Sequence, residues 1–121
     1  MNIAIAIFIG GGLGSLSRFY LSKIVSSNFT HINPMATLLA NVFSVIILAF
    51  AVYWFYNKDM MQPTMKFFLI TGFCGGFSTF STFSYETFEL FRLNMPFYAI
   101  ANVLVSVLLG VFLIFLISKW A

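Results

Sequence analysis

One segment of the sequence concentrates residue types that could handle an ion. Between Thr71 and Ser84, the glycine pair Gly75-Gly76 is followed by phenylalanines that alternate with serines and threonines. Glycine in a helix interior costs about 1 kcal/mol relative to alanine, so the pair predicts an interruption of helical structure. Carbonyls freed at an interruption can coordinate a cation, while the amides that begin the next helical segment favour an anion.

The residues after the glycine pair supply neutral groups that suit a dehydrated anion. Phe77, Phe80 and Phe83 recur every three residues, which keeps their rings on one drifting face of a helix. The positive edge of an aromatic ring attracts an anion, and the hydroxyls of Ser81 and Thr82 can donate hydrogen bonds. These features indicate an anion pathway without fixed charge. The alternative is that the rings pack or face lipid and the hydroxyls bond to nearby carbonyls of their own helix.

The elements that must position these residues are membrane helices. Of the 121 residues, 61% are hydrophobic, 20% are aromatic and only 7% are charged, whereas soluble chains carry roughly 25% charged residues. A spanning helix takes about 20 apolar residues, so four spans use about 80 and leave no room for a catalytic module. We therefore expect an all-α membrane protein of one domain that is not an enzyme.

Four apolar stretches are separated by short polar segments. We expect spans over about residues 2–25, 34–56, 65–91 and 97–118. The third span is predicted to be broken at Gly75-Gly76, close to the middle of the bilayer. Backbone freed at that depth cannot face lipid, so it must be satisfied by protein, an ion or water.

The basic residues show no bias toward one side of the membrane, although such a bias normally fixes the orientation of a chain. With four spans, one side carries Lys58, Lys66 and Lys119, and the other carries Lys23, Arg92 and, if it extends outward, Arg18. The balance is compatible with insertion in both orientations and with an antiparallel pair of subunits about a two-fold axis in the membrane plane. A balanced count also arises by chance when charges are so few.

Polar residues in the second and fourth spans have two interpretations each. Asn41 lies inside the second span, with Thr37 one turn earlier on the same face, and an amide at that depth requires a partner. It could border the pathway or form a hydrogen bond between helices. In the fourth span, Asn102, Ser106 and Gly110 lie along one face, which is either a polar track or a packing seam.

The first span carries glycines and one arginine. Gly10 and Gly14 form a GxxxG pair, which favours close helix packing. Arg18, one turn further, could give a water-filled mouth a positive potential that attracts anions, or could simply extend to the interface. Glu86, in the last turns of the third span, could pair with Arg18 or border the pathway.

Three stretches form a combined signature. They read Gly-Gly-Leu-Gly-Ser-Leu-Ser-Arg-Phe at 11–19, Thr-Leu-Leu-Ala-Asn at 37–41 and Gly-Phe-Cys-Gly-Gly-Phe-Ser-Thr-Phe-Ser-Thr-Phe-Ser at 72–84. Together they resemble the Fluc (CrcB) family of bacterial fluoride channels, and the resemblance covers essentially the whole chain. It implies a passive, fluoride-selective channel in the plasma (inner) membrane that exports fluoride from the cytoplasm and relieves its toxicity. It also implies a dual-topology homodimer with a structural sodium ion at its centre.

The resemblance also implies roles for individual residues. Sodium would be held by the backbone oxygens of Gly75 and Ser78, where the family usually has threonine at the second position. The fluoride pore would be lined by Phe80, Phe83, Asn41, Thr37, Ser81, Thr82, Ser106 and Glu86, with Arg18 at its mouth. The chain departs from the family pattern at Ala36, Ser44, Leu48 and Gly110, of which the first three bear on packing of the second span.

Two other functions compete with a fluoride channel. A small dual-topology multidrug exporter also forms antiparallel dimers, but it needs a buried carboxylate in its first span, and residues 1–25 contain no Asp or Glu. The second alternative is a non-conducting structural membrane subunit, in which the phenylalanine and glycine patterns serve packing alone.

Overall fold

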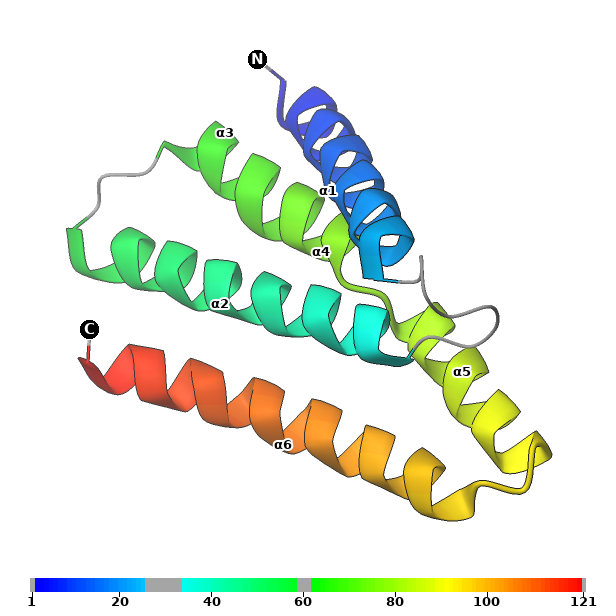
Figure 1. Ribbon diagram of the computed structural model, residues 1–121. Coiled ribbons are helices and arrows are strands. Elements are labelled where there is room, and N and C mark those ends of the chain that lie inside the picture. Colours follow the sequence, from blue (N-terminus) through cyan, green and yellow to red (C-terminus); the bar gives the residue numbers. More distant parts are fainter. Residues whose placement is uncertain (1, 26–33, 59–61, 121) are drawn as a thin grey trace.

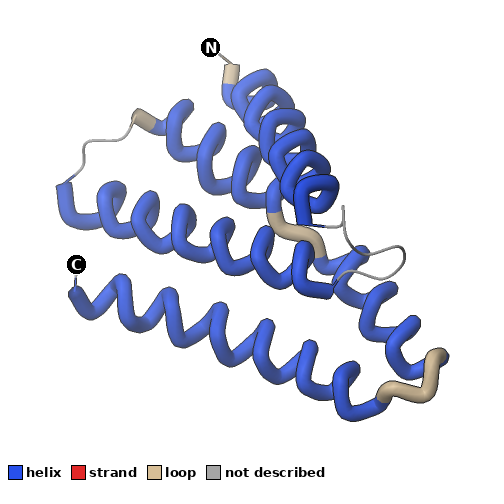
Figure 2. The backbone as a smooth tube through the Cα atoms, viewed as in Figure 1, coloured by secondary structure: helices blue, strands red, loops and turns tan. Residues whose placement is uncertain are grey.

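The computed structural model describes residues 2–25, 34–58 and 62–120, which are predominantly helical and contain no strand (Figures 1 and 2). Four segments are long and apolar enough to cross a membrane: Ile3–Val25, Pro34–Tyr53, Pro63–Arg92 and Pro96–Lys119. The prediction of an all-α chain with four helices able to span a membrane is confirmed for the described residues. Most of the first two predicted connections lies outside them.

Three of the spans are continuous helices and the third is composite. The continuous ones are α1 (Ile3–Val25), α2 (Pro34–Lys58) and α6 (Pro96–Trp120). The third span consists of α3 (Pro63–Lys66), the π-helical segment η2 (Phe67–Cys74), α4 (Gly75–Phe77) and α5 (Phe80–Arg92). Proline begins α2, α3 and α6, where its fixed φ suits a helix and its missing N–H leaves no helical bond unmade.

Helical backbone is interrupted at Ser78 and Thr79, between α4 and α5. Both residues are extended, with φ −84° and ψ 156° at Ser78 and φ −150° and ψ 123° at Thr79. Gly75 and Gly76 are themselves α-helical, so the predicted position of the break is wrong. The physical reason is that Gly76 serves close packing: a Cβ there would overlap the carbonyl of Gly11 on α1.

Glycines allow α1 to lie directly against the first half of the third span. A Cβ on Gly10 or Gly14 of α1 would overlap the backbone of the third span, and a Cβ on Gly72 or Gly76 would overlap the backbone of α1. A Cβ on Gly72 would lie 2.8 Å from the carbonyl oxygen of Ile7. The predicted close packing at Gly10 and Gly14 is confirmed. The third span contributes a second GxxxG pair, Gly72 and Gly76, which the sequence analysis did not single out.

Helix α2 is the central element, because it packs against α1, η2, α4, α5 and α6. Its buried positions are mostly small, including Ala40, Ser44 and Ala49. Helix α6 runs beside α2 (Figure 1) and leaves large apolar side chains such as Leu108 and Phe115 exposed. Exposed apolar surface of this kind suits contact with lipid or with another subunit.

The turn between α5 and α6 is fixed by backbone hydrogen bonds. Asn94 adopts φ 59°, its N–H donates to the Phe91 carbonyl at 3.1 Å, and the Met95 N–H donates to the Leu90 carbonyl at 2.9 Å. This is a Schellman motif, in which a left-handed residue ends the helix. Pro96 then begins α6, so the reversal brings α6 back along α5 and α2.

Substitution of Gly14 tests the glycine crossing. Gly14→Ala is expected to lower the free energy of unfolding by about 1–3 kcal/mol, because its Cβ would lie 2.8 Å from the Phe77 amide nitrogen and overlap the Phe73 carbonyl. Gly12→Ala is the matched control on the same helix, because a Cβ there meets nothing within 4 Å. This substitution should stabilise the helix by about 1 kcal/mol, since alanine has the higher helix propensity. Thermal or denaturant unfolding in detergent measures both; equal effects would contradict the crossing.

Candidate functional site

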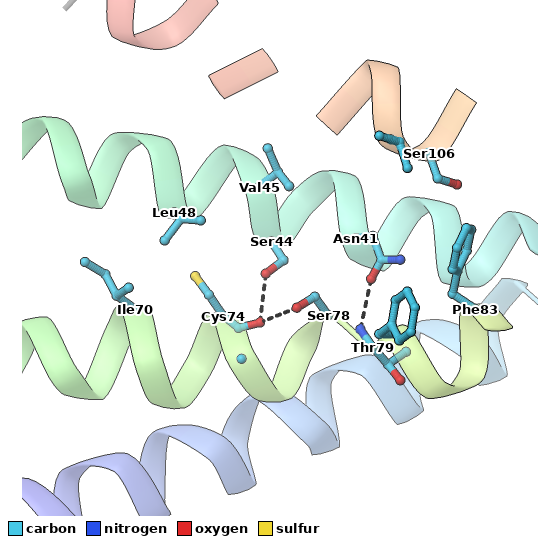
Figure 3. Close-up of a pocket in the computed structure, with 13 residues that line it drawn as sticks. Asn41, Ser44, Val45, Leu48, Ile70, Cys74, Ser78, Thr79, Phe83 and Ser106 are labelled. Carbon is cyan, nitrogen blue, oxygen red and sulfur yellow. Dashed lines mark hydrogen bonds between the residues drawn. The ribbon is translucent and has the colours of Figure 1, made fainter. Parts of the chain in front are cut away.

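A pocket of about 510 Å³ opens beside the interruption of the third span, between α2, η2, α4, α5 and α6 (Figure 3). Of the predicted site residues, six line it: Asn41, Gly75, Ser78, Phe80, Phe83 and Ser106. Five others are not among the lining residues: Arg18, Thr37, Ser81, Thr82 and Glu86. The structure thus gathers half of the predicted set in one place.

Asn41 joins α2 to the amide of Thr79, the second residue of the interruption. Its Oδ1 accepts a hydrogen bond from the Thr79 N–H at 3.0 Å. Because a backbone N–H can only donate, the amide oxygen must face Thr79, and Nδ2 then points away toward Phe83 (Figure 3). Asn41 therefore makes the hydrogen bond between helices that the packing interpretation required and also presents an NH₂ donor to the pocket.

Two phenylalanines of α5 border the pocket. The rings of Phe80 and Phe83 lie with centroids 6.2 Å apart and planes tilted by 41°. Phe80 is 80% exposed, whereas Phe83 is half-buried. Phe77 does not continue this row: it is buried on α4 and stacks on Phe73 at 5.6 Å. The interpretation of three rings on one face is wrong for Phe77, because the extended residues break the helical register.

Thr79 begins α5 as its N-cap. Its Oγ1 accepts a hydrogen bond from the Thr82 N–H at 3.2 Å. The same hydroxyl lies 3.2 Å from the Ser81 hydroxyl and donates to the Thr82 hydroxyl at 3.3 Å. The predicted residues Ser81 and Thr82 thus belong to a hydroxyl cluster in the first turn of α5. Sequence reasoning missed the cap, although a threonine before a helical run is its usual signal.

The interruption changes the partners of several carbonyls. The Thr79 N–H donates to Asn41, so the Gly75 carbonyl four residues earlier loses its helical donor. The Gly76 carbonyl accepts from Nε of Arg18 at 3.3 Å. A cation is favourable at the carbonyl end of a helical segment. Arg18 therefore ties α1 to the end of α4, a contact that was not foreseen for the predicted mouth residue.

Ser44 is a further residue of the site that sequence reasoning treated only as a packing change. Its hydroxyl donates to the Cys74 carbonyl at 2.9 Å, and it lines the pocket (Figure 3). The same carbonyl accepts from the Ser78 hydroxyl at 2.8 Å. The signal for Ser44 was its position one turn after Asn41, on the same face of α2.

A second polar group lies along α2 and α5, away from the pocket. Thr37 donates a short hydrogen bond to Oε1 of Glu86, and the two residues are only 5% and 6% exposed. On α6, Asn102 donates to the hydroxyl of Thr87 at 3.0 Å and links α6 to α5. Ser106 Oγ is buried without a hydrogen-bond partner, and its hydroxyl points toward Phe83 (Figure 3).

Comparison with known proteins identifies the family. Residues 5–117 match the family described as CrcB-like protein, Camphor Resistance (CrcB). The chain belongs to this family. A protein of an Enterobacter species named fluoride-specific ion channel FluC is 37% identical over 99% of this chain and 93% of its own length. A protein of the same name from Pyrococcus horikoshii is 41% identical over 95% and 92%, and one from Proteus mirabilis 47% identical over 65% and 63%.

The resemblance drawn from the sequence to the CrcB family is therefore confirmed, and the relatives' name is that of an ion channel, not an enzyme. Its three motifs fall on elements that meet at the interruption: residues 11–19 on α1, 37–41 on α2, and 72–84 from η2 to α5. The motifs are thus distant along the chain but adjacent in the fold.

Replacement of the α5 cap tests the role of Thr79. Thr79→Ala is expected to lower the free energy of unfolding by about 1 kcal/mol, because the Thr82 N–H loses its acceptor at the start of α5. Thr79→Ser keeps the hydroxyl and should remain close to the wild type. Unfolding of both variants in detergent measures the difference, and an Ala variant as stable as the Ser variant would show that the cap contributes nothing.

Proposed function

We propose that this member of the CrcB family is a passive fluoride channel. The observation that carries the proposal is the pocket beside the interruption, whose lining combines the Asn41 amide, the Phe83 ring and the buried Ser106 hydroxyl without any charged residue among the described ones. The name of the relatives, fluoride-specific ion channel, supplies the ion. A neutral lining compensates part of the dehydration of an anion without trapping it, as conduction requires.

The proposed path uses donors from three helices. The Asn41 NH₂ on α2, the ring edges of Phe80 and Phe83 on α5, and the Ser106 hydroxyl on α6 would contact the anion in turn. The hydroxyl groups of Ser81 and Thr82 and the Thr37–Glu86 pair would continue the polar path along α5 and α2. We assign Arg18 to the mouth, where its charge raises the local concentration of anions.

The direction of transport follows from the membrane potential. An interior-negative potential is worth about 2.3 kcal/mol per charge per 100 mV and drives an anion outward without another energy source. Hydrogen fluoride that enters from an acidic exterior would ionise in the cytoplasm, and the channel would let the ion leave. We therefore infer that the protein lies in the plasma (inner) membrane and relieves fluoride toxicity.

We further propose an antiparallel, dual-topology homodimer. The Phe80 ring is 80% exposed and yet borders the pocket, so a second subunit would complete the wall. The Gly75 surface is also open, with nothing within 4 Å of a Cβ built there. The balance of basic residues between the two expected sides of the membrane is compatible with insertion in both directions.

A structural sodium ion fits the backbone at the proposed dimer centre. The Gly75 carbonyl has lost its helical donor to Asn41 and lies at an open surface, and Ser78 follows at the interruption. The backbone oxygens of Gly75 and Ser78 from both subunits would hold the ion, because hard cations take oxygen ligands of this kind. The positive charge would offset the carbonyl dipoles that face one another across the two-fold axis.

Ion flux from liposomes tests the proposed function directly. Liposomes loaded with fluoride and containing the purified protein should release fluoride, detected with a fluoride electrode, once a potassium ionophore allows charge balance. Chloride loaded in the same way should stay inside. Absence of fluoride flux under a potential would favour a non-conducting subunit, and proton-coupled efflux of an organic cation would favour a multidrug exporter.

Replacement of the pore phenylalanines tests ring-edge contact. Phe80→Ile and Phe83→Ile should each reduce fluoride flux to the leak of protein-free liposomes, because an aliphatic side chain has no positive edge. Phe88→Ile is the matched control: it lies on the same helix, is exposed and does not line the pocket, so flux should persist. Size-exclusion profiles should be unchanged in all three, and retained flux in the pore variants would exclude this role.

A further inference from the structure

The peptide units on either side of the Gly75–Gly76 peptide are anchored by side chains from two other helices. On one side, the Ser44 hydroxyl of α2 donates to the Cys74 carbonyl at 2.9 Å. On the other side, Nε of Arg18 on α1 donates to the Gly76 carbonyl at 3.3 Å. The carbonyl between them, that of Gly75, therefore belongs to a segment whose two neighbours are fixed from outside.

Gly75 has a helical backbone whose N–H donates to the Gly72 carbonyl, but nothing packs against its side-chain position. A Cβ built there meets nothing within 4 Å, and the residue is exposed. The amide that would bond its carbonyl in a continuous helix, that of Thr79, donates to Asn41 instead. Glycine also has the widest conformational freedom of any residue. The direction of the Gly75 carbonyl consequently depends on the anchored peptide units next to it.

Ser44 is the better placed of the two anchors for this purpose. It is 3% exposed, and its hydroxyl shares the Cys74 carbonyl with the hydroxyl and the N–H of Ser78, at 2.8 and 3.0 Å. Asn41, one turn earlier on α2, holds the Thr79 amide. One face of α2 thus secures the backbone both before and after the residues proposed to bind sodium.

We propose that Ser44 is a positioning residue that orients the Gly75 carbonyl for sodium. The Ser44 hydroxyl fixes the Cys74 carbonyl and so orders the backbone of the site before sodium binds. Because less conformational entropy is then lost on binding, the affinity for sodium is higher. This inference rests on the sodium site of the proposed function and adds to it a residue that does not touch the ion.

The test is a sodium titration of the full-length protein in detergent, with N-methylglucamine replacing sodium at constant ionic strength. Dimer fraction and thermal midpoint are followed for the wild type, Ser44→Ala and Ser44→Thr. In Ser44→Ala, the sodium concentration for half-maximal stabilisation should rise roughly three- to tenfold. This is about the change in affinity that corresponds to the loss of one hydrogen bond. At saturating sodium, the Ala variant should still assemble. Ser44→Thr keeps the hydroxyl and should restore most of the affinity.

A control separates positioning from packing. Ala49→Gly alters another buried small residue of α2 and should lower the thermal midpoint equally at every sodium concentration. The inference is overturned if Ser44→Ala behaves like this control or leaves the titration unchanged. A wild type whose assembly is indifferent to sodium overturns the sodium site and this inference together. A sodium-dependent wild type with an unshifted Ser44→Ala overturns this inference alone.

Discussion

The need to satisfy backbone polar groups away from water governs the centre of this protein. Where the third span stops being helical, at Ser78 and Thr79, its amides and carbonyls lose their regular partners. Side chains of other helices replace some of them: Asn41 accepts from the Thr79 amide, and Arg18 donates to the Gly76 carbonyl. Ser44 adds a donor to the Cys74 carbonyl, which also keeps its helical donor, the Ser78 N–H. Unpaired groups at such a depth would be strongly unfavourable. The interruption therefore exists only because α1 and α2 lie close enough to supply these partners.

That closeness depends in turn on small residues. Gly10 and Gly14 let α1 lie against the backbone of η2 and α4, which brings the following turn of α1, with Arg18, to the end of α4. On α2, the buried positions around Asn41 and Ser44 are mostly alanine, so the helix can approach the third span from the other side. Packing and the hydrogen bonds at the interruption are thus coupled in this fold, because a bulkier residue at either contact would move the groups that hold the interruption.

The sequence predicted the four helices and the family well, since long apolar runs and motifs such as residues 72–84 are strong local signals. It misplaced the interruption because glycine propensity does not distinguish a break from a close contact, and Gly76 is in contact with α1. Asn41, Phe83 and Ser106, which were predicted for a pore, line one pocket, whereas the contact of Arg18 with a carbonyl was not predicted. This contact depends on how close α1 and α4 lie to each other. The spacing of residues within either helix does not determine that distance.

The π-helical segment Phe67–Cys74 has a consequence for how the third span can be read and altered. Each hydrogen bond there reaches one residue further than in an α-helix, so the segment takes up extra chain, and one residue corresponds to about 100° of rotation in an α-helix. A helical wheel begun at Met65 therefore misassigns the faces of every residue after Cys74. Because the segment already takes up extra chain, it could accommodate the insertion or deletion of one residue. The residues after Cys74 would then keep their positions relative to the other helices.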